Sequence, residues 1–548
     1  MRSNTVTSYF IIGARLVKAA FVWPSKYDYI EDLYSLQAGV IRHGFIDNVS
    51  PCAFNGNIKG RQDAAAWVRT AYHDAATHNA EAGTGGLDAS ILFETDRPEN
   101  PGTAFNDTFS FFSAHYNGDV SFADLIALGL VTATASCGGP KVPFRMGRID
   151  ATEAGVLGVP EPQQDLDKHK AIFAKAGFNT EDMIAMVACG HTLGGVHHED
   201  FPGMNENPNK GETSRFEGND NEHPYQFDNA IATQYLDGST ENPLVVGHND
   251  TTNSDKRIFG ADGNKTMNAL KDPAQFKTMC ANIFARMIDS VPAGVTLTEP
   301  LEPFNMKPYI TTLALNSNGS LDFTGRIRVR VTKGVTDWNP EDLAVRLMYK
   351  GREGATNGTI ETQPEHFKGG QSTGLFNEVF QWFNFEAQLD ASTGIRGFTI
   401  ELTVPSTGKV AVFDNEGTGL YPVQDAILYQ KAQSCMDTNS PSTSDPSPFI
   451  VTAAVRKDQT ATAAAMELAF RTPRQGILIN KLEKKKFALE RTDKETPSDE
   501  YVLYEVQMPL ASSSWSTTMD LVLGEGESEK RVKHLLTNDL AGAACQPL

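Results

Sequence analysis

The hydrophobic period of this chain changes near residue 290, and this change constrains the fold more than any other feature. Upstream, apolar residues recur at helical spacing, as in residues 61–77 and in the almost wholly apolar residues 122–136. Downstream, polar and apolar residues alternate, as in RIRVRV at 326–331 and FTIELTV at 398–404. The pattern predicts a multidomain chain, with a mainly α-helical part followed by a β-rich, sandwich-like part.

The composition around this change predicts the domain boundaries. Residues 291–308 contain four prolines and form the predicted linker between a helical domain at 23–290 and a β-rich region at 309–548. The low-complexity run TNSPSTSDPSP divides the β-rich region into two predicted modules, split near 436–449. Residues 1–22 resemble a signal peptide whose apolar run is interrupted by basic residues.

Residues that favour helix starts support the helical pattern. Ser121 and Thr180 are each expected to cap the helix that follows. Further helices are predicted at 25–36 and 272–288, and further strands at 409–413, 450–456, 466–471, 501–508 and 519–523.

The charge of the chain argues against some classes of function. Its 548 residues include 48 Lys and Arg against 68 Asp and Glu, so the formal net charge is −20. A protein that binds the phosphate backbone of nucleic acid carries the opposite charge, and the basic run KLEKKK at 481–486 is interpreted as a surface turn. No run of 18 or more apolar residues occurs, so no membrane-spanning helix is expected.

Cysteines and sequons favour a secreted, extracellular glycoprotein. The six cysteines are an even number, as a disulfide framework requires. Six Asn-x-Ser/Thr sequons occur, at Asn48, Asn106, Asn249, Asn264, Asn318 and Asn357.

Arg69 and His73 are four residues apart, so a helix places them on one face. A base with a fixed cation beside it suits the heterolytic cleavage of a peroxide. His73 would move the proton between the two oxygens, and Arg69 would stabilise the negative charge on the leaving oxygen. From these residues alone, a surface arginine and a core histidine are the alternative interpretation.

His191 lies near the end of a predicted helix, in the segment CGHTLGG. A histidine there can be the axial ligand of a haem if a carboxylate holds its other ring nitrogen. A separate loop carries Asp74, Gly86, Asp88 and Ser90, whose carboxylate, hydroxyl and carbonyl oxygens suit a hard cation such as Ca²⁺. A core histidine and an ordinary polar loop are the alternatives.

Taken together, these residues resemble, in order and spacing, the haem peroxidases of the plant, fungal and bacterial superfamily over residues 23–290. In character the resemblance is closest to the secreted fungal (class II-like) enzymes, which favours a filamentous fungus as the source. The motifs that carry it are Arg69-x-x-Tyr72-His73-Asp74, Gly86-x-Asp88-x-Ser90, Glu94 with Asn100 six positions later, Gly147-Arg148-x-Asp150, Val159-Pro160-x-Pro162, Gly190-His191-Thr192, Phe227-Asp228-Asn229 and Ser254-Asp255.

The resemblance implies an H₂O₂-dependent peroxidase with haem b, which oxidises small phenolic or similar one-electron donors through an oxyferryl intermediate. His191 would bind the haem iron and Asp255 would hold its other nitrogen, with Asp262 as a rival for that role. Asn100, supported by Glu94, would keep the distal histidine neutral. Tyr72 and Pro160 would lie at the haem, Asp74, Gly86, Asp88 and Ser90 would bind a distal Ca²⁺, and Thr192 and Asp228 would bind a proximal ion.

Departures from the family pattern bear on the donor and on the proximal ion. Tyr72 stands where the secreted classes usually have Phe and the intracellular class Trp, and it is interpreted chiefly as a packing residue. Met186 replaces the surface-oxidised Trp of lignin peroxidases, and Gln62 and Ala66 replace the acidic ligands of manganese peroxidases. A generic donor site at the haem edge is therefore expected. The proximal ligands between Thr192 and Asp228 have no clean register at 220–223, so calcium is the expected ion, with potassium or an empty site as the alternatives.

The resemblance also implies a bridge between two of the cysteines, Cys52 and Cys137. The remaining four allow three pairings, of which the expected one joins Cys189 to Cys280 and Cys435 to Cys545.

The β-rich region resembles no family at the level of motifs. Its row Arg326, Arg328 and Arg330 is interpreted as a solvated strand face, with a grip on an acidic polysaccharide as the alternative. Two other functions stay open: a non-catalytic secreted protein that binds cell wall or matrix through the β-rich half, and a peroxidase whose donor is a polymer presented by that half.

Overall fold

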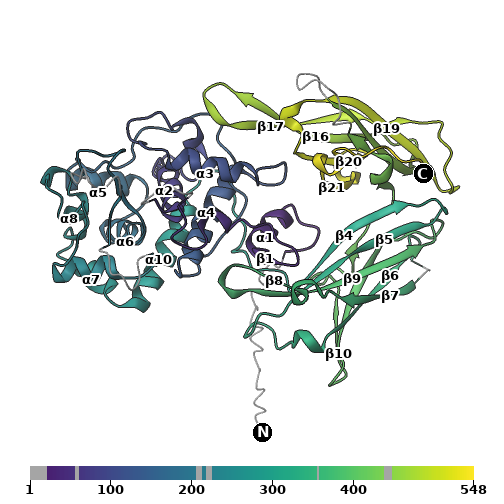
Figure 1. Cartoon of the computed structure of the whole chain (residues 1–548), viewed down its shortest axis with the longest axis horizontal. Helices are drawn as coiled ribbons and strands as arrows, with labels where there is room; N and C mark the ends of the chain where they lie inside the picture. Colours follow the sequence, from purple (N-terminus) through teal and green to yellow (C-terminus); the bar gives the residue numbers. More distant parts are fainter. Residues whose placement is uncertain (1–20, 56–60, 205–212, 218–224, 355–356, 437–446) are drawn as a thin grey trace, which may run out of the picture.

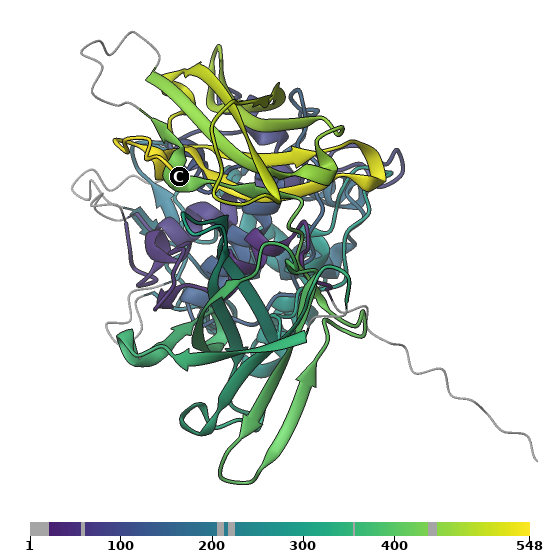
Figure 2. The same cartoon turned by 90° about the vertical axis from the view of Figure 1, so that its right-hand side faces the viewer.

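The computed structural model describes residues 21–55, 61–204, 213–217, 225–354, 357–436 and 447–548. Most of the predicted signal segment, the run 220–223 and most of the TNSPSTSDPSP linker lie outside the described residues. Figure 1 shows a helical part on one side of the molecule and two β-sheet modules on the other. In the view of Figure 2 the two modules lie one above the other, in front of the helical part.

The helical part is built around α4, whose residues 122–134 are all buried, as its apolar sequence predicts. Ser121 caps α4 as expected, because its hydroxyl accepts from the Asp124 N–H at 3.0 Å. The cap of α6 is Asn179 and not Thr180: Asn179 and Asp182 exchange side-chain-to-backbone bonds. Within the described residues the helices are α1 Asp28–Ser35, α2 Asp63–Ala75, α3 Ala104–Ser113, α4 Phe122–Ser136, α5 Leu166–Lys175, α6 Thr180–Gly190, α7 Ala230–Asp237, α8 Ser254–Phe259, α9 Lys265–Leu270 and α10 Pro273–Ile288.

The first β-sandwich follows the helices directly, and its first strand begins inside the predicted linker. One layer contains β4, β5, β9 and β8, and the other contains β6, β10 and β11. The strand β7 pairs with β9 and with β6, and so it joins the layers. The strands are β4 Met306–Leu315, β5 Leu321–Arg330, β6 Ala344–Lys350, β7 Asn357–Pro364, β8 Gln371–Thr373, β9 Val379–Leu389, β10 Gly397–Val404, β11 Lys409–Phe413 and β12 Tyr421–Pro422.

The second sandwich has one sheet formed by β13, β14, β15, β19 and β18 and another formed by β17, β16, β20 and β21. Because β13 and β14 pair with β15, this sandwich begins near residue 426, ahead of the predicted split at 436–449. Its strands are β13 Ile427–Tyr429, β14 Cys435–Met436, β15 Ser447–Arg456, β16 Ala464–Arg474, β17 Ile477–Ala488, β18 Glu490–Arg491, β19 Tyr501–Leu510, β20 Thr518–Leu523 and β21 Lys530–Leu536.

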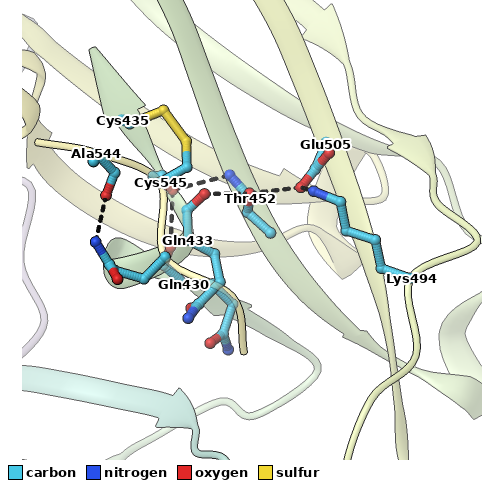
Figure 3. The surroundings of a disulfide bond; sticks show 10 residues. Gln430, Gln433, Cys435, Thr452, Lys494, Glu505, Ala544 and Cys545 are labelled. Carbon is cyan, nitrogen blue, oxygen red and sulfur yellow. Dashed lines mark hydrogen bonds and ion pairs between the residues drawn. A yellow bond between two sulfur atoms is a disulfide. The ribbon is translucent and has the colours of Figure 1, made fainter. Parts of the chain in front are cut away.

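All three expected disulfides are formed. Cys52–Cys137 and Cys189–Cys280 lie in the helical part, and Cys435–Cys545 ties the C-terminal segment to β14. Figure 3 shows the last of these beside Thr452, whose hydroxyl lies 3.0 Å from the Gln433 carbonyl oxygen and 3.1 Å from a Glu505 carboxylate oxygen. None of the helices in the described ranges has the length and apolarity needed to cross a bilayer.

Buried charges join the helical part to the first sandwich. Nζ of Lys307 on β4 lies 2.8 Å from a carboxylate oxygen of Glu31 and 2.8 Å from one of Asp32, both on α1. Arg328 on β5 pairs with the same two carboxylates and is fully buried. The short strand β1 (Ala38–Gly39), which follows α1, pairs with β8. The start of the helical part is therefore held by the β-rich region.

Neither interpretation of the arginine row holds for Arg328 or Arg330. Arg330 pairs with Glu378 and is only 5% exposed, and Arg328 lies against α1. Only Arg326 remains partly exposed. Strand alternation predicts which residues share a face, but α1 and neighbouring loops cover most of this one.

Candidate active site

A cavity of about 420 Å³ lies in the helical part between α2 and α6. Among the described residues its walls come only from positions 61 to 287, so neither sandwich lines it. Apolar side chains form the larger part of the lining, and charged or polar side chains, among them Arg69, His73 and His191, form the rest. Such a mixed lining is typical of a site for a cofactor or a small molecule.

Arg69 and His73 lie on one face of α2, and both line this cavity. Nε of Arg69 donates to Nε2 of His73 at 3.3 Å, and Nδ1 of His73 lies 2.7 Å from Oδ1 of Asn100. Nδ2 of Asn100 donates to the backbone carbonyl of Glu94 at 3.0 Å. The structure thus brings together the four residues predicted for the distal side.

The backbone carbonyl of Glu94 supports Asn100, whereas the carboxylate of Glu94 contacts other groups. Oε1 accepts from the Gly155 N–H at 2.6 Å, and Oε2 lies 3.3 Å from the Arg97 guanidinium. The carboxylate therefore holds the loop around Gly155 against the turn that carries Asn100.

Burial sets the charge of the distal pair. Removal from water, with a contribution from Arg69, lowers the pKa of His73 to about 3. Burial also lowers the pKa of Arg69, to about 10. At neutral pH the pair is a neutral imidazole beside a guanidinium cation.

On the opposite wall, His191 ends α6 and its Nδ1 lies 2.8 Å from Oδ2 of Asp255. Nδ2 of Asn242 donates to the same Asp255 oxygen at 2.8 Å. Asp262, the rival for this role, instead accepts from the N–H and hydroxyl of Thr266. The geometry therefore favours Asp255.

Two contacts of the proximal side were missed by sequence analysis. The Phe216 ring stacks on the His191 ring, with centroids 4.1 Å apart and planes within 16°. Asn242 anchors Asp255. Neither residue belongs to a motif with distinctive spacing, so a single sequence offers no signal for them.

Tyr72 and Pro160 both line the cavity, as predicted for residues at the haem. Burial raises the pKa of the Tyr72 hydroxyl, so it stays protonated across the physiological range. Trp67 lies on the other side of α2, where it packs against Phe45 and Phe112 with ring centroids 5.4 and 4.8 Å away. Trp67 is thus a packed helix residue.

The predicted distal calcium residues come together where Asp74, near the end of α2, meets the loop that carries Gly86, Asp88 and Ser90. The Asp74 carboxylate accepts from the N–H groups of Ala89 and Ile91 at 2.7 and 3.0 Å, and Asp88 accepts from the Ser90 N–H at 3.1 Å. Burial and the nearby Asp88 raise the pKa of Asp74 well above its usual range. A bound cation would stabilise the ionised Asp74 carboxylate, although its oxygens already accept hydrogen bonds from the loop backbone. Gly86 has a φ of +108°, and a Cβ there would lie 2.4 Å from the Ser290 carbonyl oxygen.

The proximal ion residues acquire a third member, Glu217. The Thr192 hydroxyl lies 2.7 Å from Oε1 of Glu217 and 2.7 Å from the backbone carbonyl oxygen of Asp228. Burial, with Asp228 nearby, raises the pKa of Glu217 well above its usual range. A hydroxyl, a carbonyl and a buried carboxylate suit a hard cation. The predicted intervening run 220–223 lies outside the described residues.

His197 is a further histidine on the cavity wall. It ends the short strand β2 (Gly195–His197), and its Nδ1 lies 2.9 Å from the Thr213 hydroxyl oxygen. The pairing of β2 with β3 (Thr213–Arg215) turns this histidine inward.

The comparison with protein families agrees with this geometry. Residues 53–272 match the family described as Peroxidase. A WSC domain-containing protein of Arthroderma benhamiae is 39% identical over 407 residues, which are 73% of this chain and 55% of that protein. L-ascorbate peroxidase 5 of Arabidopsis thaliana is 35% identical over 191 residues (34% of this chain, 63% of that protein). The mitochondrial cytochrome c peroxidase of Emericella nidulans is 33% identical over 137 residues (24% and 37%).

The helical fold and the two facing histidine sites define a peroxidase-type domain. Residues 53–272 form a domain of the haem peroxidase superfamily, and a β-rich C-terminal region follows it. The chain spans between about half and two thirds of the length of the first two relatives. Its special likeness to the secreted fungal class stays a prediction.

The residues present fit haem b. Nδ1 of His191 is bound to Asp255, which leaves Nε2 as the nitrogen available to iron. His191 keeps 31% of its side chain accessible within a cavity wall, whereas Asp255 behind it keeps 1%. A flat, mostly apolar group seated between His191 and His73 would meet a ligand on one face and an acid–base pair on the other.

Proposed function

We propose that this chain is an H₂O₂-dependent haem peroxidase that oxidises small phenolic or similar one-electron donors. The observation that carries the proposal is that His73 with Asn100 and His191 with Asp255 face one cavity from opposite walls. The overall reaction consumes one H₂O₂ and two donor molecules AH, and it yields two H₂O and two donor radicals.

When bound, the haem supplies the redox-active iron at which the O–O bond is cleaved. His191 would hold that iron, and Asp255 raises the electron donation of His191 by accepting its Nδ1 proton in a hydrogen bond. His73 takes a proton from the near oxygen of the peroxide and returns it to the far oxygen. Arg69 stabilises the negative charge that develops on the far oxygen as it leaves as water.

The cavity wall favours a small aromatic donor. Tyr72, Pro160 and Phe173 lie on it, and Gln62 and Ala66 stand on it where acidic manganese ligands would be. The absorption spectrum before and after one equivalent of H₂O₂ tests the proposal. A ferric, histidine-ligated Soret band that changes within milliseconds in the wild type, and over a hundredfold more slowly in His73→Leu, is expected. Failure of protein offered haem to bind it would overturn the proposal.

We also propose that one or two Ca²⁺ ions bind this domain. The cluster of Thr192, Glu217 and Asp228 is the stronger candidate, since the buried Glu217 carboxylate accepts from a hydroxyl and a backbone N–H of the described residues and has Asp228 nearby. The distal group with Asp74 and Asp88 is the weaker candidate, since both Asp74 oxygens already accept N–H groups.

Secretion and glycosylation remain proposals of the same kind. Three disulfides support an oxidising compartment. None of the six sequon asparagines is buried, so each can be reached by a glycan. Glycosidase treatment followed by mass measurement tests this, and an unchanged mass would contradict it.

A second candidate function is the binding of cell-wall polymer, either by a non-catalytic protein or by a peroxidase with a polymeric donor. A cavity of about 760 Å³ lies between the helical part and the second sandwich, with Tyr27, Tyr116, Lys484 and Lys533 on its walls. Rings and polar groups together suit a polysaccharide segment. Binding of the full chain to insoluble cell-wall polysaccharide should weaken in Tyr116→Ala and stay unchanged in Tyr235→Ala, which lies in α7.

A further inference from the structure

The distal histidine depends on a turn that lies outside its own helix. The short helix η2 (Ser90–Phe93) leads directly into Glu94, whose carbonyl accepts from Asn100. Asn100 in turn holds Nδ1 of His73. A shift of η2 would therefore move the group that orients the base.

The distal pair also rests on α3. The Phe105 ring, in the first turn of α3, lies 5.0 Å from the His73 ring. The same ring lies 4.6 Å from the guanidinium carbon of Arg69. A shift of α3 would therefore move the packing surface of both residues.

The β16–β17 hairpin of the second sandwich reaches η2. Figure 1 shows this hairpin extending from the upper module over the helical part, near α3. The Arg474 guanidinium lies 5.0 Å from the centre of the Phe93 ring and is fixed there by two hydrogen bonds to the Ile479 carbonyl, of 2.8 and 3.0 Å. Ile479 is only 3% exposed and belongs to the hydrophobic core of the helical part.

The same hairpin also holds the far end of α3. The Arg471 guanidinium donates to the carbonyls of Tyr116 and Ser113, at 2.6 and 3.4 Å. Ser113 is the last residue of α3 and Tyr116 lies three residues beyond it, so the cation sits at the C-terminal end of the helix, where it interacts favourably with the helix dipole. One hairpin thus touches both segments that support the distal pair.

We infer that the β16–β17 hairpin is the outer support of the distal site, with Arg474 and Arg471 as positioning residues that act on His73 and Arg69 through η2 and α3. The inference rests on the proposed peroxidase function and deepens it. It gives the C-terminal half a role in the reaction with H₂O₂, although none of the described residues of that half lines the cavity. The donor side is untouched by the hairpin, so only the peroxide step should depend on it.

The test uses the full chain, loaded with haem and haem-free, with Arg474→Ala, Arg471→Ala and Arg474→Lys. Lys481→Ala is the matched control, because Lys481 is exposed on the same hairpin and pairs with Glu483 on its own strand. Hydrogen exchange of the segments 90–101 and 104–116 is measured in haem-free protein. kcat/KM is measured separately for H₂O₂ and for a phenolic donor.

In Arg474→Ala, exchange over 90–101 should rise, and kcat/KM for H₂O₂ should fall on the order of tenfold with kcat/KM for the donor unchanged. Arg471→Ala should act in the same way, with the faster exchange over 104–116. Arg474→Lys, which keeps a cation near Phe93, should recover part of the loss, and Lys481→Ala should match the wild type.

Unchanged exchange in both arginine variants would overturn the inference, and so would faster exchange with unchanged kcat/KM for H₂O₂. An equal fall in kcat/KM for both substrates would also overturn it, because it would indicate general destabilisation. If the wild type itself binds haem but does not react with H₂O₂, the proposed function fails, and that outcome is visible before any variant is compared.

Discussion

Oδ1 of Asn100 lies 2.7 Å from Nδ1 of His73, while Nε of Arg69 lies 3.3 Å from Nε2 of the same ring. An amide oxygen only accepts hydrogen bonds and a guanidinium only donates them. The imidazole that satisfies both partners is neutral, with its proton on Nδ1 and a lone pair on Nε2. His73 is therefore prepared as a base on the side that faces the cavity.

Removing this base should slow the reaction with peroxide far more than it affects haem binding. In His73→Leu the rate constant for H₂O₂ is expected to fall by about 10² to 10⁴, the usual contribution of a general acid–base residue. Asn100→Val should cause a smaller loss, since the base remains but its tautomer is no longer fixed. Stopped-flow mixing with H₂O₂ measures both, and an unchanged Soret band before mixing serves as the control.

The pH dependence of the peroxide step should follow the depressed pKa of His73. Burial and Arg69 lower this pKa to about 3, so the imidazole stays a free base down to strongly acid pH. The rate constant is expected to be flat between about pH 8 and 5 and to fall only toward pH 3. Acid should also lower the free energy of unfolding. As pH falls, the unfolded chain protonates His73 at a higher pH than the folded chain does, so the contribution of His73 to stability is fully present above pH 6.5 and is lost as pH falls through 3. A profile of the peroxide rate constant with its midpoint near pH 6.5 would contradict the prediction.

Asp255 should tune the proximal ligand. In Asp255→Asn an amide replaces the carboxylate that accepts from Nδ1 of His191, and partners of this kind typically contribute 10- to 100-fold to metal affinity or activity. Haem affinity, measured by titration, is expected to fall within about that range. Asp262→Asn is the matched control, because Asp262 binds Thr266 and not His191. An equal effect of the two substitutions would contradict the assignment.

Sequence analysis predicted the elements that depend on local pattern. Residues 122–136 are apolar on all sides and form the buried α4, and strict alternation in residues 398–404 matches β10. The distal pair was predictable because Arg69 and His73 share one helix, so their spacing alone places them on one face. Asn100 and Asp255 became predictable only through the family resemblance, since nothing local brings either to its histidine.

Contacts made across the chain were not predictable. Phe216 and Glu217 follow β3, a strand of three residues, and no periodic pattern marks them. Arg328 was expected to face solvent, because alternation describes one strand and not the helix α1 that covers it. Arg474 contacts Phe93 over 381 positions of sequence, a relationship that depends on how the second sandwich docks.

The proximal cluster should bind a cation. Glu217 is buried beside Asp228 with a raised pKa, so an ion there would replace a proton and stabilise the folded state. Added Ca²⁺ or K⁺ is expected to raise the unfolding temperature of the wild type, by about 5 °C at a hundredfold excess over Kd. Glu217→Gln should lose this response, whereas Glu181→Gln, at an exposed site, should keep it. Equal responses of the wild type and Glu217→Gln would remove Glu217 from the ion site.

The buried charges between α1 and the first sandwich should make the two parts interdependent. In Arg328→Met, Glu31 and Asp32 lose one of their two cationic partners, and breaking a buried pair typically costs about 3–5 kcal/mol. Arg326→Met is the matched control on the same strand and face, and it should change stability by less than about 0.5 kcal/mol. Chemical unfolding at neutral pH compares the two variants.

Burial alone would raise the pKa of Glu31, but Arg328 and Lys307 hold it at about 2, so its carboxylate contributes stability above pH 4.5 that is lost as pH falls through 2. The difference between Arg328→Met and the wild type should therefore shrink in acid, and a difference that grows with falling pH would contradict this account of the interface.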